Sequence, residues 1–195
     1  MPSYSYILRI EAIEPDDDRL DALADVVDDV VFASRAGLAS VTLVVESVTS
    51  RAAGIDAVRA ARAAGLVPLR TIPDLVDRRE ISERVGVTRQ AVGNWARGDR
   101  QGTTDFPAPY AFVSGEIWLW HDVAAWLRES GVFDEDLETP DWSDLIATDR
   151  WIADDPDARA PSDRFASEPV ATGDWDFASS GYTLSRDEAR EVAGS

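Results

Sequence analysis

Side chains that form hydrogen bonds are concentrated between residues 88 and 100, at a spacing that fits one face of a helix. Arginine pairs with guanine through two hydrogen bonds, and glutamine or asparagine pairs similarly with adenine. From Arg84 to Thr104 the chain has four arginines and one acidic residue, so the local charge is +3. We therefore expect Arg89, Gln90 and Asn94 to contact DNA bases and Arg97 and Arg100 to contact phosphates, with Thr88 as a further DNA-binding residue.

The sequence that must position these residues has the pattern of two short helices joined by a tight turn. Asp77 and Glu80 have capping-box spacing, which predicts a helix start. Gly86 suits the turn, Thr88 caps the second helix and Gly98 ends it. The side chains expected in a shared core are Ile81, Val85, Val87, Val92 and Trp95. This pattern predicts a helix–turn–helix, in which the first residues of the second helix contact base edges in the major groove of DNA. The alternative is a helical hairpin with a solvated polar face.

A β-hairpin and a third helix are predicted next. The segment 106–109 reads Phe-Pro-Ala-Pro, and strands are expected over 110–113 and 116–120, joined by a two-residue turn of Ser114 and Gly115. His121 and Asp122 then open a helix, and we interpret His121 as a structural cap. The apolar residues of that helix are Val123, Trp126 and Leu127.

With these motifs in place, residues 77–130 resemble the winged helix–turn–helix domains of the MerR and excisionase kind. The resemblance implies sequence-specific binding of double-stranded DNA, with Ser114 and Gly115 at the tip of the hairpin contacting DNA as well, and it implies a transcriptional regulator. Together with the segment that precedes it, the chain is similar to an uncharacterised class of actinobacterial DNA-binding proteins.

Residues 1–76 show a strand–helix–strand–strand–helix–strand pattern. Strands are predicted over 4–10, 30–33, 38–46 and 67–71, and a helix over 50–65. The acidic residues 16–18 are interpreted as a helix start rather than a metal site, because acidic groups favour the positive end of a helix. This βαββαβ order predicts a ferredoxin-like domain, which either senses a signal or dimerises. No long helix follows Leu127, so we expect a homodimer joined through residues 1–76.

Residues 131–195 are strongly acidic, with 17 acidic residues, 5 arginines and a net charge of -12. We expect a mostly irregular, extended tail with two short helices, one marked by Leu145, Ile146 and Ile152 and the other over 185–193. Its aromatic residues, among them Trp142, Trp151, Trp175 and Phe177, either pack on the chain's own domains or hold a protein partner. The second possibility gives an alternative function, that of an antitoxin-like or phage-related interaction protein.

Composition excludes several other classes. The 195 residues include no cysteine and one histidine, so thiol catalysis and multi-histidine metal sites are excluded. No nucleophile–base pair or glycine-rich phosphate loop can be assembled, so we expect neither an enzyme nor a bound cofactor or metal. No apolar run is long enough to span a membrane, and a cytoplasmic location is expected. The predicted fold class is α+β: a ferredoxin-like domain over 1–76, a winged helix–turn–helix over 77–130 and an acidic tail over 131–195.

Overall fold

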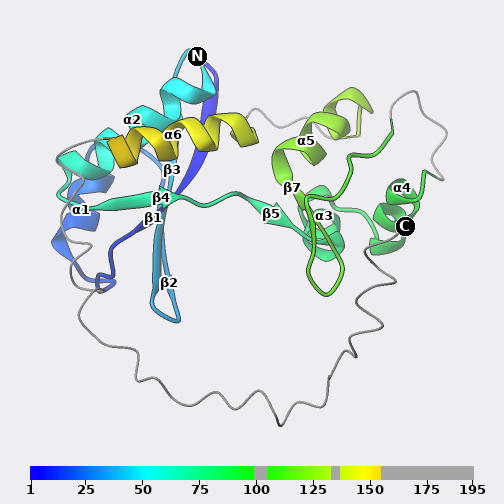
Figure 1. Cartoon of the computed structure of the whole chain (residues 1–195), viewed down its shortest axis with the longest axis horizontal. Helices are drawn as coiled ribbons and strands as arrows, with labels where there is room; N and C mark the ends of the chain where they lie inside the picture. Colours follow the sequence, from blue (N-terminus) through cyan, green and yellow to red (C-terminus); the bar gives the residue numbers. More distant parts are fainter. Residues whose placement is uncertain (99–104, 133–136, 155–195) are drawn as a thin grey trace, which may run out of the picture. The chain divides into compact units, whose positions relative to one another are not determined.

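The computed structural model describes residues 1–98, 105–132 and 137–154 (Figure 1). These residues form helices together with a five-stranded and a three-stranded sheet, which confirms the α+β class. Buried apolar side chains gather in two clusters, called here the first core and the second core. The first core is built mainly on residues 1–71, and the second on residues 75–132.

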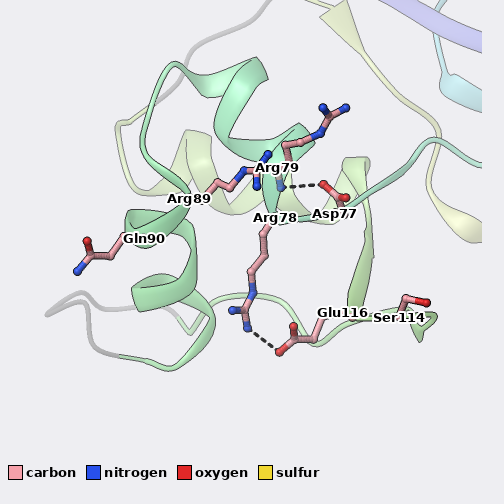
Figure 2. Close-up of a pocket in the computed structure, with 8 residues that line it drawn as sticks. Asp77, Arg78, Arg79, Arg89, Gln90, Ser114 and Glu116 are labelled. Carbon is pink, nitrogen blue, oxygen red and sulfur yellow. Dashed lines mark hydrogen bonds and ion pairs between the residues drawn. The ribbon is translucent and has the colours of Figure 1, made fainter.

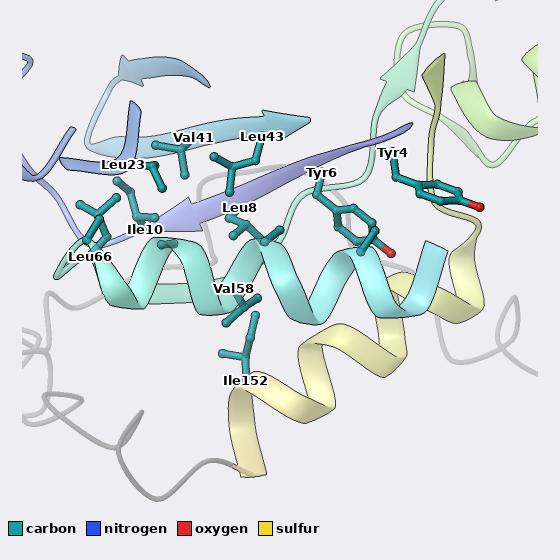
Figure 3. Close-up of a cluster of buried hydrophobic side chains, with 14 of the residues drawn as sticks. Tyr4, Tyr6, Leu8, Ile10, Leu23, Val41, Leu43, Val58, Leu66 and Ile152 are labelled. Atoms are coloured by element: carbon teal, nitrogen blue, oxygen red, sulfur yellow. The ribbon is translucent and has the colours of Figure 1, made fainter. Parts of the chain in front are cut away.

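The first core contains the four strands that the alternating pattern predicted. They are antiparallel and lie in the order β2-β3-β1-β4. Their bounds are β1 Ser3–Ile10, β2 Val30–Arg35, β3 Leu38–Glu46 and β4 Pro68–Thr71. Alternate residues of β1 are buried: Tyr4, Tyr6, Leu8 and Ile10 point to one face (Figure 3).

Two helices of the first core, α1 (Asp18–Ala24) and α2 (Ser50–Ala63), begin at side-chain caps. Asp17 accepts a hydrogen bond from the backbone N–H of Arg19, so the predicted role of the acidic run as a helix start is confirmed. Arg19 also forms ion pairs with Asp17 and Glu11, at 2.8 and 2.6 Å. The Arg19 guanidinium lowers the pKa of the Asp17 carboxyl to about 2 through its hydrogen bonds.

The chain returns to the first core after residue 136, where a helix is present as the spacing of Leu145, Ile146 and Ile152 predicted. Strand β8 (Leu137–Glu138) pairs in parallel with the start of β1, and helix α6 (Trp142–Asp154) follows it. Leu145 and Ile152 of α6 are buried in the first core. This segment therefore packs on the chain's own fold, driven by burial of apolar side chains that an extended chain would expose.

Polar contacts also fix α6 to the sheet and to α2. The Asp149 carboxylate accepts hydrogen bonds from the Thr71 backbone N–H and hydroxyl, at 2.6 and 2.8 Å. Trp151 is half-buried beneath the guanidinium groups of Arg59 and Arg62, which lie 5.6 and 4.9 Å from its ring centre. Trp142 is exposed. The other two aromatic residues assigned to the tail, at positions 175 and 177, lie outside the described residues.

Helices α2 and α6 approach each other closely at Gly54. A Cβ atom at this position would overlap the Thr148 hydroxyl oxygen and lie 2.8 Å from Cζ of Tyr6. Both neighbours are fully buried. The Tyr6 hydroxyl donates to the Ser50 carbonyl oxygen, and the Thr148 hydroxyl donates to the Asp144 carbonyl oxygen. Glycine is therefore required at position 54 by space rather than by backbone conformation.

The second core is formed by three helices and a small antiparallel sheet of order β5-β7-β6. Their bounds are β5 Leu75–Val76, α3 Arg78–Val85, α4 Arg89–Ala96, β6 Ala111–Phe112, β7 Glu116–Leu119 and α5 Trp120–Glu129. All of the apolar residues predicted to face inward on the first two helices contribute to this core. Three aromatic rings pack around Phe106, with centroid separations from Phe106 of 6.4 Å to Trp95, 5.6 Å to Trp118 and 4.9 Å to Trp126.

The hairpin differs from its prediction in the length of its turn. Phe112 pairs with Glu116, so the loop contains the three residues Val113, Ser114 and Gly115 instead of two. Ser114 and Gly115 both have positive φ, at 55° and 147°. The strand pairing ends one residue earlier than the apolar pattern indicates, because Val113 lies in the loop and is exposed.

Candidate nucleic-acid interface

The starts of α3 and α4 are held in place by local hydrogen bonds. Asp77 accepts from the backbone N–H groups of Arg79 and Glu80, while the Glu80 carboxylate accepts from the N–H of Asp77, so the predicted capping box is confirmed. Gly86 has φ 72°, a left-handed conformation that glycine adopts without strain, and it ends α3. Thr88 then caps α4 by accepting from the N–H of Ala91.

These helix starts and the hairpin loop border one open hollow of about 490 Å³ (Figure 2). Helix α4 contributes Arg89 and Gln90, which were predicted as base-contacting residues. The hairpin contributes Ser114 and Gly115, which were predicted from the resemblance. The hollow thus brings together residues from three segments, and its full lining is Asp77, Arg78, Arg79, Arg89, Gln90, Ser114, Gly115 and Glu116. We call this surface the groove.

The remaining predicted residues have different positions. Thr88 is exposed, but its hydroxyl is used in the cap. Asn94 is half-buried and accepts a 2.5 Å hydrogen bond from Arg97, which is exposed at the C-terminal end of α4. Neither Asn94 nor Arg97 lines the groove. Arg100 lies outside the described residues.

Two arginines of the groove, Arg78 and Arg79, were not predicted as site residues. Arg78 forms a 2.7 Å ion pair with Glu116 across the groove, and its Nη1 lies close above Gly93 of α4. Its Nε is buried and has no hydrogen-bond partner within the described part of the chain. Arg79 is exposed and lies 3.7 Å from Glu83. The available signal in the sequence was the basic pair Arg78 and Arg79 directly after the Asp77 cap.

The electrostatics of the groove favour an anionic ligand. It holds three arginines against two carboxylates, those of Asp77 and Glu116. Asp77 is occupied by the helix cap and Glu116 by Arg78. Arg89 is exposed, and no ion pair involves it among the described residues. The groove therefore presents Arg89 and Arg79 as cations that are open to solvent, inside a chain whose net charge is -18.

His121 has a structural role other than the predicted cap. Helix α5 begins at Trp120 and has no side-chain cap. Instead, Nδ1 of His121 lies 2.6 Å from the Thr139 carbonyl oxygen, in the segment that follows β8. Nearby, the Tyr110 ring lies 5.2 Å from that of Trp142. These contacts connect the second core to the segment that enters the first.

Comparison with protein-family models, with curated proteins and with solved structures found no match to this chain. Among the residues that the structure describes, no cluster of three histidine, aspartate or glutamate side chains is suited to a metal ion. Over the same residues, no helix has the length and apolar character needed to cross a bilayer.

Proposed function

We propose that this protein binds double-stranded DNA with sequence preference through the groove, as a winged helix–turn–helix protein that regulates transcription. The observation that carries the proposal is the groove itself, where the start of α4 lies beside the basic start of α3 and the hairpin loop. A helix start that presents Arg89 and Gln90 suits base edges in the major groove. The strand order β2-β3-β1-β4 supports a ferredoxin-like assignment for the first core.

Different residues of the groove have different expected roles. Arg89 and Gln90 read base edges, because they are exposed on the first turn of α4. Arg79 contacts phosphate, because it lies at the basic start of α3 rather than on the reading helix. The exposed loop of Ser114 and Gly115 brings backbone N–H groups and a hydroxyl to a neighbouring phosphate. Arg97 is a further phosphate contact beyond the groove.

The overall charge makes this binding selective against nonspecific DNA. A net charge of -18 repels a polyanion at long range, so only the locally basic groove lowers the free energy of the complex. We expect affinity that falls steeply with salt, as for any protein that displaces counterions from phosphates.

The test starts with selection of binding sites from a random double-stranded library, followed by anisotropy titrations at fixed salt. Arg89→Ala should lose about 1–3 kcal/mol on the selected site and relax the preference at one base pair, while Arg79→Ala should weaken all sequences alike and reduce the salt slope. Arg128→Ala is the matched control, since Arg128 is an exposed arginine on α5 outside the groove. A folded Arg89→Ala protein with wild-type specificity would refute the proposal, as would a selection that enriches no sequence.

A further inference from the structure

One face of the first sheet carries no helix among the described residues. Helices α1, α2 and α6 all contribute to the first core, on the side to which Tyr6 and Leu8 point (Figure 3). The alternate residues of the strands point to the opposite side, which we call the open face. Its exposed or half-buried members include Ile7, Arg9, Val31, Arg35, Thr42, Val44 and Arg70. Val31 is 63% exposed.

The open face is basic at one end. Arg9 and Arg70 are directly opposite each other on β1 and β4, so their side chains point to the same side. Arg35 lies at the same end, where β2 finishes. No ion pair involves any of these three arginines in the described ranges. Like charges placed directly opposite on adjacent strands destabilise a sheet, so this end favours a partner that supplies carboxylates.

The other end of the open face is acidic. Asp29 lies opposite Val44, whose N–H donates to the Asp29 carbonyl oxygen at 3.2 Å. Glu46 is two residues further along β3, in register with Ser3. Both acidic residues are exposed and, with Asp28, they line a hollow of about 320 Å³. From Ser40, which is in register with Arg9, to Glu46 the strand rises by roughly 20 Å.

Apolar side chains occupy the middle of the open face. Ile7 is in register with Thr42, and Thr42 is in register with Val31, so these residues form one row across three strands. Val44 belongs to the next row. The face therefore has a basic end, an apolar centre and an acidic end. An anionic peptide or a nucleic acid would be repelled by Asp29 and Glu46.

We propose that the open face binds a second copy of this chain. In a two-fold dimer the same patch faces itself in the opposite direction. The basic end of each copy then meets the acidic end of the other, twice per dimer, and the two apolar centres meet between them. The hollow beside Asp29 and Glu46 has room for an arginine side chain of the partner copy. This inference goes beyond DNA binding and does not depend on it.

The geometry also sets the strength of this dimer. Four strands about 4.8 Å apart, with about eight residues rising 3.4 Å each, give a face of roughly 500 Å². This is below the roughly 800 Å² per partner of a standard interface, so we expect a dimer that forms at tens of micromolar protein. At about 0.1 M salt, charges more than about 10 Å apart are largely screened, which reduces repulsion between the two acidic chains more than it weakens close pairs.

A charge-swap experiment tests the proposal. Sedimentation equilibrium of the full chain at 0.1 M salt compares wild type with two double variants, Arg9→Glu/Arg70→Glu and Asp29→Arg/Glu46→Arg. Each double variant places like charges at both contacts of its own dimer, so its dissociation constant should rise by about 100-fold. In a 1:1 mixture every contact again pairs opposite charges, so a heterodimer should form with an affinity within about tenfold of wild type.

Arg128→Glu/Arg150→Glu is the matched control, because it changes the charge equally at exposed arginines outside the open face. It should remain as dimeric as wild type, and circular dichroism verifies that all variants are folded. The proposal is overturned by a wild-type monomer at 200 µM, by double variants that still dimerise, or by a mixture that stays monomeric. Failure of DNA binding alone would leave the dimer unaffected.

Discussion

An alanine at position 54 is a sensitive probe of the packing between α2 and α6. Gly54 lies inside α2, where alanine is normally the more favourable residue. In this fold, however, the added methyl group would overlap the Thr148 hydroxyl oxygen and press on the Tyr6 ring. The substitution therefore sets intrinsic helix propensity against tertiary packing, and the sign of the stability change reports how closely α6 packs on α2.

The magnitude follows from these two opposing effects. Replacing glycine by alanine within a helix contributes about 1 kcal/mol of stability when the site is open. Overpacking a core costs about 1–3 kcal/mol, and the upper part of that range is expected when the neighbours cannot move. Tyr6 and Thr148 are fully buried and are both held by hydrogen bonds to backbone carbonyl groups. We expect Gly54→Ala to lower the free energy of unfolding by roughly 1–2 kcal/mol.

The assay is urea unfolding followed by tryptophan fluorescence, and a second glycine provides the control. Gly93 also lies inside a helix, α4, but a Cβ there would meet only the ends of the Arg97 and Arg78 side chains, at 3.4 and 3.6 Å. Gly93→Ala should therefore raise stability by up to about 1 kcal/mol. The two substitutions are chemically identical and should have opposite signs.

A Gly54→Ala protein that is as stable as wild type, or more stable, would refute the close packing of α6 on α2. The double variant Gly54→Ala/Thr148→Ala sharpens the test, because it removes the nearest colliding atom. The double variant should lose less stability than the sum of the losses in the two single variants, because the two residues are in contact. Additivity of the two changes would also contradict the proposed collision.

Three further outcomes are expected. Asp149→Ala should lower the free energy of unfolding by about 1–3 kcal/mol in urea, because the buried N–H of Thr71 loses its acceptor, whereas Asp149→Asn should lose less. Truncation after Gly131 should lower the melting temperature and the solubility, because it removes α6 and the burial of Leu145 and Ile152, each contributing about 1.5–3 kcal/mol; an unchanged melting temperature would contradict the packing of α6. The pKa of Asp17 is lowered from 3.8 to about 2, so its pairing stabilises the fold above pH 3.8, and this stabilisation is lost as the pH falls through 2. The difference in the free energy of unfolding between wild type and Asp17→Asn should therefore narrow over that pH range. A difference that stays constant would contradict the pairing.

Elements with a strong local signal could be predicted from the sequence. The alternation of Tyr4, Tyr6, Leu8 and Ile10 predicted β1, and the Asp77 capping box predicted the start of α3. Such patterns are set by residues close together in the chain, so they need no knowledge of the rest of the fold. The same holds for Arg89 and Gln90, whose exposure follows from the apolar face of their own helix.

Features that depend on distant contacts could not be predicted in this way. Strand β8 has two residues, too few for a periodic signal, and its pairing with Ser3 joins opposite parts of the chain. The sequence left open whether the apolar residues of this acidic segment pack on the chain's own fold or on a partner, and the burial of Leu145 and Ile152 depends on first-core residues far away in the chain. Likewise, Arg78 became a site residue only when the hairpin brought Glu116 to it. Local composition contains no information about such neighbours.

The return of the chain to β1 has a consequence for synthesis on the ribosome. The first core combines strands from the first residues of the chain with α6, which ends at Asp154, while the described residues of the second core lie between Leu75 and Val132. Because domains fold as their sequence emerges, the second core can be complete while the first still lacks its last helix. Until residue 154 has left the exit tunnel, the surfaces of Tyr6 and Val58 that α6 will cover remain open to chaperones and to other nascent chains. A nascent chain that has left the tunnel as far as Val132, with α6 still inside it, would thus present a folded second core on an unfinished first one.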